Sequence, residues 1–135
     1  MHAGLGSTLP VSYVQVADAA GNDAVVSAAP RGSVVINATG LGKDRPGSPL
    51  TDKVVFPQDS IAWDFNYRGE LVFLDQARAQ QSSLNVRVED GWVYFLHGWT
   101  RVIADVFGID IPTRGPAFER LSDIALNVSK KEISK

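Results

Sequence analysis

The sequence predicts an α/β fold, a three-layer sandwich built on a mostly parallel sheet. Short apolar runs alternate along the chain with stretches of helical periodicity, which is the pattern of βαβ units. The clearest run, Val34–Thr39, is continuous and rich in β-branched residues, as in a strand buried on both faces. It ends in polar residues followed by two glycines, and the ligands of open α/β sheets bind at this carboxyl edge.

Length and composition indicate one globular domain. The 135 residues are 44% hydrophobic and carry a net charge of −2, which does not favour a nucleic-acid or anionic-membrane surface. No apolar run approaches the roughly 20 residues of a membrane span, and the start lacks a signal-peptide core, so we expect a cytoplasmic protein. With no cysteine and two histidines, we predict no metal site. The domain is expected over residues 1–128, before a disordered tail over 129–135.

The amino-terminal half of the sequence predicts two strands and a short helix, followed by a long loop. Val11–Ala17 alternates loosely between apolar and polar residues and predicts a strand. Asp23–Ala29 is rich in small residues and predicts a short helix with Asn22 as its N-cap. The strand over Val34–Thr39 comes next. Gly40–Ser60 is a long loop with several prolines, of the kind that is often functional, and Val54–Phe56 is expected to anchor it.

The carboxyl-terminal half predicts two more strands and three helices. Ile61–Asn66 and Asn85–Val88 are short apolar runs, and Glu70–Gln80 between them has helical spacing. Val93–Phe107 is the longest helix and Phe118–Val128 is a terminal amphipathic helix. Apolar residues at helical spacing on the longest helix are Trp99, Val102, Ile103, Val106 and Phe107, and those expected to face inward on the last helix are Phe118, Leu121, Ile124, Ala125 and Val128.

Three short segments resemble the shikimate dehydrogenase family. Ile36–Gly42 (I-N-A-T-G-L-G), Asp64–Tyr67 (D-F-N-Y) and Asp90–Leu96 (D-G-W-V-Y-F-L) are similar to its I-N-A-T-S-x-G-M, D-x-x-Y and D-G-x-x-M-L-x-x-Q motifs. They occur in the same order and at nearly the same spacing. Phe73–Ala77 is similar to the family's T-x-F-L-x-x-A segment, and Val106–Pro112 to its F-x-x-W-T-G-x-x-P ending.

The resemblance covers roughly residues 24–112 and implies a partial Rossmann-like cofactor domain. Enzymes of this family have two domains and reduce 3-dehydroshikimate with NADPH on the way to aromatic amino acids. Their amino-terminal domain holds substrate contacts and a catalytic Lys–Asp pair, and their cofactor domain contains a strand–G-x-G-G-x-x–helix unit. This sequence resembles only the second part of the cofactor domain. Gly4–Ser7 is Gly-rich, but no strand precedes it and no helix follows it. We therefore expect no catalytic residue here.

The resemblance also implies a set of binding residues at the strand ends. The first motif would line the nicotinamide-ribose side of an NADP cleft, Phe65 would touch the nicotinamide face, and the Gly91 backbone would approach its amide. The Tyr67 hydroxyl would reach the substrate carboxylate. The implied cofactor-binding residues are Asn37, Ala38, Thr39, Gly40, Phe65 and Gly91, and the implied substrate-binding residue is Tyr67.

Each of these residues also has a purely structural interpretation. Asn37 and Thr39 can satisfy backbone groups where a strand ends, Phe65 can pack in the core, Tyr67 can rest half-exposed on a loop, and Gly91 can serve a turn. A buried Asp64 is expected to hydrogen-bond a neighbouring loop.

Two further groups are better explained structurally than as sites. His97 is more typical of a hydrogen-bonded helix residue than of a base. Lys43-Asp44-Arg45 could meet an anion such as a 2′-phosphate, but a solvated loop triplet is the simpler interpretation.

Departures from the family motifs leave the function open. Gly40 replaces a serine, Lys43 and Tyr94 replace methionines, and Gly98 falls where the family has a substrate-binding glutamine. The main hypothesis is the carboxyl-terminal portion of a shikimate dehydrogenase-like oxidoreductase, inactive alone, with NAD and NADP not distinguished. The alternatives are a non-catalytic binding or assembly module and a related enzyme with another substrate.

The predicted half-sheet leaves one strand without a neighbour. In the strand order of these domains, Val34–Thr39 would lie beside a strand that this sequence does not contain. An apolar strand edge is a template for pairing. We expect both that this segment comes from a longer chain and that it forms a homodimer through that edge, with pairing of the edge to Val11–Ala17 as the alternative.

Overall fold

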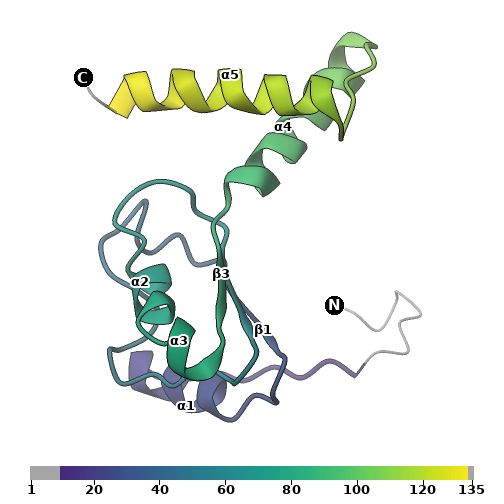
Figure 1. Ribbon diagram of the computed structural model, residues 1–135. Coiled ribbons are helices and arrows are strands. Elements are labelled where there is room, and N and C mark those ends of the chain that lie inside the picture. Colours follow the sequence, from purple (N-terminus) through teal and green to yellow (C-terminus); the bar gives the residue numbers. More distant parts are fainter. Residues whose placement is uncertain (1–9, 134–135) are drawn as a thin grey trace.

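The computed structural model describes residues 10–133 and contains a three-stranded parallel sheet (Figure 1). The strands are β1 (Val34–Asn37), β2 (Ile61–Asp64) and β3 (Arg87–Glu89), in the spatial order β1-β2-β3. Val34 pairs with Ile61, and Ile61 pairs with Arg87. The predicted mixed α/β class and the parallel sheet are therefore confirmed, and the sheet is small and open.

Five helices accompany the sheet. They are α1 (Ala19–Ser27), α2 (Val72–Arg78), α3 (Gln81–Leu84), α4 (Trp92–Phe107) and α5 (Pro116–Ile133). The structure divides the predicted helix over Glu70–Gln80 differently, since α2 is shorter and a separate turn of helix, α3, follows it. None of the helices in the described part of the chain is long and apolar enough to cross a membrane.

The hydrophobic core lies on one face of the sheet, against α2 and the long loop before β2. In the strands that form this face, Ala62 is fully buried and Val35 and Val88 pack against the cluster, as the twofold alternation of a strand requires. Phe56 and Phe73 meet edge to face with ring centroids 5.7 Å apart. The expected anchor in the loop is confirmed, because Val54 and Phe56 are both buried. The core residues are Leu50, Val54, Phe56, Ala62, Phe73, Leu74, Ala77 and Val86.

The opposite face of the sheet is open over β1 among the described residues, whereas on β2 Trp63 is packed by Tyr94, with ring centroids 5.9 Å apart. Val34 and Ile36 point to it and are 52% and 47% exposed, whereas Asn37 is buried. The prediction that this strand is buried on both faces, and with it the third layer of the sandwich, is wrong for the part of the chain that the structure describes. A continuous apolar run indicates which residues are stabilised by burial, but it does not indicate whether a second layer is present to cover them.

The amino-terminal strand is not formed. Residues 11–16 have no regular structure, and Val11, Tyr13 and Val14 are exposed. The first helix begins at Ala19 instead of Asp23, because Asp18 caps it: its Oδ1 accepts from the Gly21 N–H at 2.9 Å. A loose alternation makes a strand only where a neighbouring strand hydrogen-bonds to it, and none of the three described strands pairs with this segment. Gly4–Ser7 lies outside the described residues.

Helices α4 and α5 lead away from the sheet. In Figure 1, α4 rises from the end of β3 and α5 returns across its top. On α4 the buried residues are Leu96, Thr100 and Ala104. Helix α5 runs to Ile133, so the predicted disordered tail is wrong over residues 129–133, while residues 134–135 lie outside the description. Residues of the predicted apolar faces that are exposed in the structure are Trp99, Val102, Ile103, Val106, Phe107, Ile124 and Val128.

Candidate functional site

The three segments singled out by the sequence meet at the carboxyl edge of the sheet. Because the strands are parallel and adjacent, the residues that follow β1, β2 and β3 emerge side by side. We call this region the rim and define it as Asn37–Gly42, Asp64–Tyr67 and Asp90–Gly91. Asn37 on β1 and Asp64 on β2 are register partners. The Gly91 N–H donates to the Asn66 carbonyl at 3.0 Å, which ties the third segment to the second.

The centre of the rim is a buried carboxylate held by neutral donors. Asp64 is fully buried, and its Oδ2 accepts from the Asn37 side-chain amide at 2.9 Å. Its Oδ1 accepts from the Asn66 backbone N–H at 2.8 Å. Asn37 and Asn66 also direct their amides at the Leu41 carbonyl, at 3.4 and 3.3 Å. Asp64 therefore fastens the loop after β1 to the end of β2, which agrees with its structural interpretation.

Thr39 closes the turn that follows β1. Its hydroxyl donates to Asn37 Oδ1 at 2.7 Å and accepts from the Leu41 N–H at 3.2 Å. Its own N–H donates to the same Asn37 oxygen at 3.1 Å. These contacts satisfy local backbone groups, as the structural interpretation expects. Ala38 and Thr39 nevertheless remain solvent-exposed at the strand end, while Gly40 is partly exposed with a φ of +77°.

Two glycines allow the loops after β1 and β2 to touch. Gly42 has a φ of +90°, and its carbonyl accepts from the Glu70 N–H at 2.8 Å just before α2 begins. A Cβ on Gly69 would lie 2.1 Å from that same carbonyl oxygen, so no side chain fits there. The second glycine of the first motif thus has a structural role, which is to seat the start of α2 against the rim.

The backbone that follows β2 leaves no room for a side chain at position 91. A Cβ at this position would lie 2.0 Å from the Phe65 carbonyl oxygen and 2.4 Å from its carbon. Gly91 therefore lies against the protein's own backbone, and its approach to a nicotinamide amide stays a prediction. The Phe65 ring stacks on Tyr94, with centroids 4.8 Å apart and planes inclined by 13°, and it also meets Trp63.

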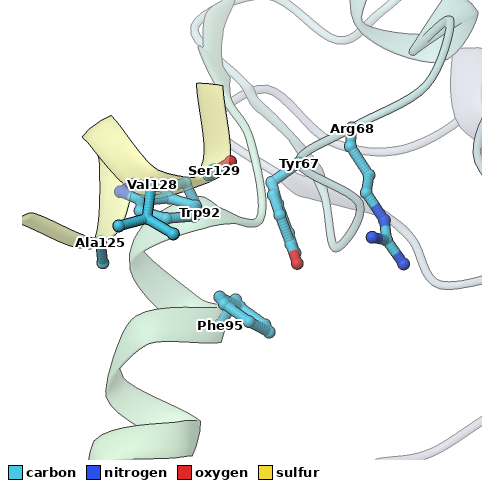
Figure 2. Close-up of a pocket in the computed structure, with 7 residues that line it drawn as sticks. All are labelled: Tyr67, Arg68, Trp92, Phe95, Ala125, Val128 and Ser129. Carbon is cyan, nitrogen blue, oxygen red and sulfur yellow. The ribbon is translucent and has the colours of Figure 1, made fainter. Parts of the chain in front are cut away.

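A cavity of about 500 Å³ with aromatic walls lies at the Tyr67 end of the rim. Figure 2 shows Tyr67 and Phe95 facing each other while α5 closes the side over Trp92. The Tyr67 ring lies 4.5 Å from Phe95 and 5.4 Å from Trp92, centroid to centroid. The Arg68 guanidinium stands 5.8 Å from the Tyr67 centroid. The residues lining this cavity, which we call the aromatic cavity, are Tyr67, Arg68, Trp92, Phe95, Ala125, Val128 and Ser129.

The predicted site residues share the rim but not one cavity. Asn37 and Thr39 line a separate hollow of about 180 Å³ between β1 and α1, and Tyr67 lines the aromatic cavity. The sequence interpretation missed Arg68 and Trp92 as lining residues. Tyr67-Arg68 following a strand end was a usable signal for the former, whereas Trp92 takes this role only because α5 folds back over it.

The remaining candidates have structural partners. His97 stacks on Phe118 with ring centroids 4.5 Å apart, which joins α4 to α5. Lys43 pairs with Asp44 at 3.3 Å, so its charge is partly neutralised. Within residues 10–133 no cluster of three or more potential metal ligands occurs.

At the opposite edge of the sheet, where the strands begin, an ion pair and a hydrogen bond join the segments that precede the strands. Asn85 donates to Asp59 Oδ1 at 2.7 Å, and Arg31 forms an ion pair with the same carboxylate. The hydrogen bond from Asn85, aided by Arg31, lowers the pKa of Asp59 below its ordinary value of 3.8. These contacts connect the residues that precede β1, β2 and β3, and they lie away from the rim.

Comparison with known proteins adds no relative: no family model, curated protein or solved structure matches this chain. The assignment of function therefore depends on the rim and the cavities beside it.

Proposed function

We propose that this chain is the nicotinamide-side portion of a shikimate dehydrogenase-like cofactor domain. One observation carries the proposal: the three motif-like segments, separated by about 25 residues each in the chain, are adjacent at the carboxyl rim of a parallel sheet. This is the edge at which open α/β sheets bind ligands. Had the segments occupied unrelated faces, the resemblance would have had no physical basis.

The aromatic cavity is the part of the rim that suits the substrate. Three rings provide an apolar wall, and Arg68 provides the one formal charge among the lining residues. Arg68 has no ion-pair partner among the described residues, so its guanidinium can take a carboxylate in bidentate fashion. A small ring that bears a carboxylate fits this combination, with the Tyr67 hydroxyl as a second donor to the anion.

The β1 end of the rim is the part that fits NADP. When bound, the cofactor would supply the hydride, and the chain's role would be to position the nicotinamide ribose. Ala38 and Thr39 are solvent-exposed there. Gly91 and Phe65 fit less well, because the Gly91 face is filled by the Phe65 carbonyl. We therefore assign the cofactor contacts of this chain chiefly to Ala38 and Thr39.

Calorimetric titration of the 135-residue polypeptide tests the proposal. We expect shikimate to bind weakly, with NADP⁺ or NAD⁺ weaker still, and no turnover with either nucleotide, because the sequence contains no glycine-loop unit and no catalytic Lys–Asp pair. Tyr67→Phe keeps the ring but removes the hydroxyl, and should weaken shikimate binding about fivefold to tenfold, the value of one hydrogen bond. Tyr94→Phe is the matched control, because Tyr94 lies outside this cavity. Equal losses in both variants, or turnover by the polypeptide alone, would contradict the proposal.

A specific observation favours a second candidate, a non-catalytic binding module. Gly98 occupies the position of the family's substrate-binding glutamine, and it is exposed with open space beside its Cα. A site that has lost this contact can retain the scaffold without the reaction. Millimolar shikimate and nucleotide that produce no heat in the titration would favour this second candidate over the first.

A further inference from the structure

The two edges of the sheet differ in their protection against pairing. At the β3 edge, Arg87 and Glu89 form an ion pair with Nε and Oε1 3.1 Å apart. Charged side chains are a usual means of blocking an edge strand. The β1 edge is Val34-Val35-Ile36, which has no charge and no proline. The sequence therefore protects one edge and leaves the other open.

The hydrogen-bonding groups on the open edge can be identified by parity. The Ser33 carbonyl accepts from the Ile61 N–H and the Asn37 carbonyl accepts from the Phe65 N–H, both at 3.0 Å. Odd-numbered residues of β1 therefore direct their backbone groups to β2, and Val34 and Ile36 direct theirs away from it. No residue within 10–133 bonds to these two N–H and two carbonyl groups.

An apolar shoulder flanks this edge. Val25 on α1 is 44% exposed beside it. The hollow of about 180 Å³ between α1 and β1 is lined there by Val25, Val26 and Ile36. A polypeptide paired with β1 would cover this apolar surface as well as the open backbone groups.

We propose that β1 pairs antiparallel with β1 of a second copy of this chain. A twofold axis midway between the two copies of Val35 sets Val34 opposite Ile36 of the second copy, and Ile36 opposite its Val34. Val34 of each copy then exchanges both of its outward hydrogen bonds with Ile36 of the other copy. All the outward N–H and carbonyl groups of both strands are bonded in this way, because the outward groups belong to the first and last residues of the three-residue edge. The two sheets become one sheet of six strands, with both α1 helices on the same face. This pairing does not depend on the proposed function.

The form of the edge favours a second copy as the occupant. Val34 and Ile36, which are 52% and 47% exposed, would lie opposite each other across the axis, on the same face of the joined sheet. Side chains directly opposite on one face of an antiparallel pair of strands are in contact, so the pairing would cover both residues as well as their outward backbone groups.

Light scattering after size-exclusion chromatography gives the first test. We expect a mass of twice 14.6 kDa at micromolar concentration. Ile36→Pro removes an outward N–H without affecting the bonds to β2, so this variant should elute as a monomer with unchanged circular dichroism. A monomeric parent protein, or a dimer that persists in a folded Ile36→Pro variant, would overturn the proposal. If the parent protein is a monomer, the partner of the β1 edge would have to be a strand from a different polypeptide.

Cysteine cross-linking tests the register and does not depend on the proline variant folding. The sequence has no cysteine, so Val35→Cys introduces one thiol per copy. The proposed axis brings the two thiols to a non-hydrogen-bonded pair with Cα atoms about 4.5 Å apart, within disulfide range. Val34→Cys is the control, because its two copies would be about 8 Å apart on the diagonal. Oxidation should cross-link most of Val35→Cys and little of Val34→Cys. Equal yields, or none from Val35→Cys, would refute the pairing.

Discussion

Replacing Gly91 with alanine separates a steric requirement from a conformational one. Gly91 has a φ of −82°, which alanine adopts freely, so backbone strain contributes nothing. The added Cβ would lie 2.0 Å from the Phe65 carbonyl oxygen, whereas a relaxed carbon–oxygen contact is about 3.3 Å. The two backbones must therefore separate by more than about 1 Å, which strains the 3.0 Å hydrogen bond from Gly91 to Asn66.

The expected loss of stability is about 3 kcal/mol, at the upper end of the overpacking range because both clashing groups are backbone. With an unfolding entropy of about 2.1 cal/mol/K per residue, this lowers the melting temperature by about 10 °C. Thermal unfolding followed by circular dichroism measures the change. Gly98→Ala is the matched control: Gly98 lies within α4, and a Cβ added there would meet no atom within 4 Å. Alanine there should raise stability by about 0.5–1 kcal/mol.

Opposite signs for the two glycine variants are the result that the packing argument requires. If Gly91→Ala melted within about 2 °C of the parent protein, the close approach to Phe65 would not be a constraint on this position. The role implied by the family resemblance, contact with a nicotinamide amide, would then become the better explanation of this glycine. If both variants lost stability equally, the effect would come from the helix and not from Phe65.

Three further substitutions test the rim, the loop anchor and the amino-terminal edge. Asp64→Asn replaces one of the two acceptor oxygens with an NH2 donor, which then faces either the Asn37 amide or the Asn66 N–H, and should cost about 2 kcal/mol in urea unfolding. Asp44→Asn on the exposed loop should change stability by less than about 0.5 kcal/mol. Phe56→Ala should cost about 3–5 kcal/mol, against less than about 0.5 kcal/mol for the exposed Val55→Ala; similar losses would exclude Phe56 as the anchor. Because the pKa of Asp59 is lowered on folding, its contribution is present above pH 3.8 and is lost as the pH falls through the lower folded value. The melting-temperature difference between the parent protein and Asp59→Asn should therefore be present at pH 7 and shrink toward pH 3; a pH-independent difference would contradict the titration.

The strands could be predicted where the local signal and the tertiary environment agree. The apolar residues around Val35, Ala62 and Val88 are either continuous or alternate with polar residues, as in strands, and each of these runs pairs with a neighbour in the sheet. Val11–Ala17 has a similar pattern, but it pairs with none of the strands in residues 10–133 and its backbone is irregular. Strand formation depends on hydrogen bonds to another segment, and a single stretch of sequence does not contain that information.

Helix periodicity predicted α4 and α5 but not their surroundings. An amphipathic pattern identifies which residues share a face, but it did not identify the buried faces of these helices. Trp99, Val102 and Ile103 of the predicted stripe on α4 are exposed, and so are Ile124 and Val128, which were expected to face inward on α5. Whether a stripe is buried depends on what lies against it. In the described structure Leu96 and Ala104 are buried, whereas Val106 and Phe107 are more than 70% exposed.

The rim could be predicted from a general rule, whereas the aromatic cavity could not. Residues that follow parallel strands converge, so the convergence of Asn37, Asp64 and Gly91 needed only the order of the strands. The wall formed by Ala125 and Val128 depends on the reversal between α4 and α5. No local pattern sets the angle at which α5 returns over Trp92, and that angle creates the cavity.

The structural roles of the motif residues limit what the resemblance itself can prove. Asn37, Thr39, Gly42 and Gly91 each hold one part of the rim to another, by hydrogen bonds or by making room for backbone. A chain that had lost its cofactor would still need them in order to fold. Retention of these residues therefore supports the architecture more strongly than the activity.

Residues without a structural task are the better indicators of function. At the rim, the Tyr67 hydroxyl makes no hydrogen bond to the described residues and Arg68 makes no ion pair with them, yet both border a cavity of about 500 Å³. The packing of Tyr67 on Phe95 and Trp92 uses its ring and leaves its hydroxyl unassigned. A fold that needed only the ring would be served equally by phenylalanine. Ligand binding by Tyr67→Phe thus measures function with the least contribution from stability.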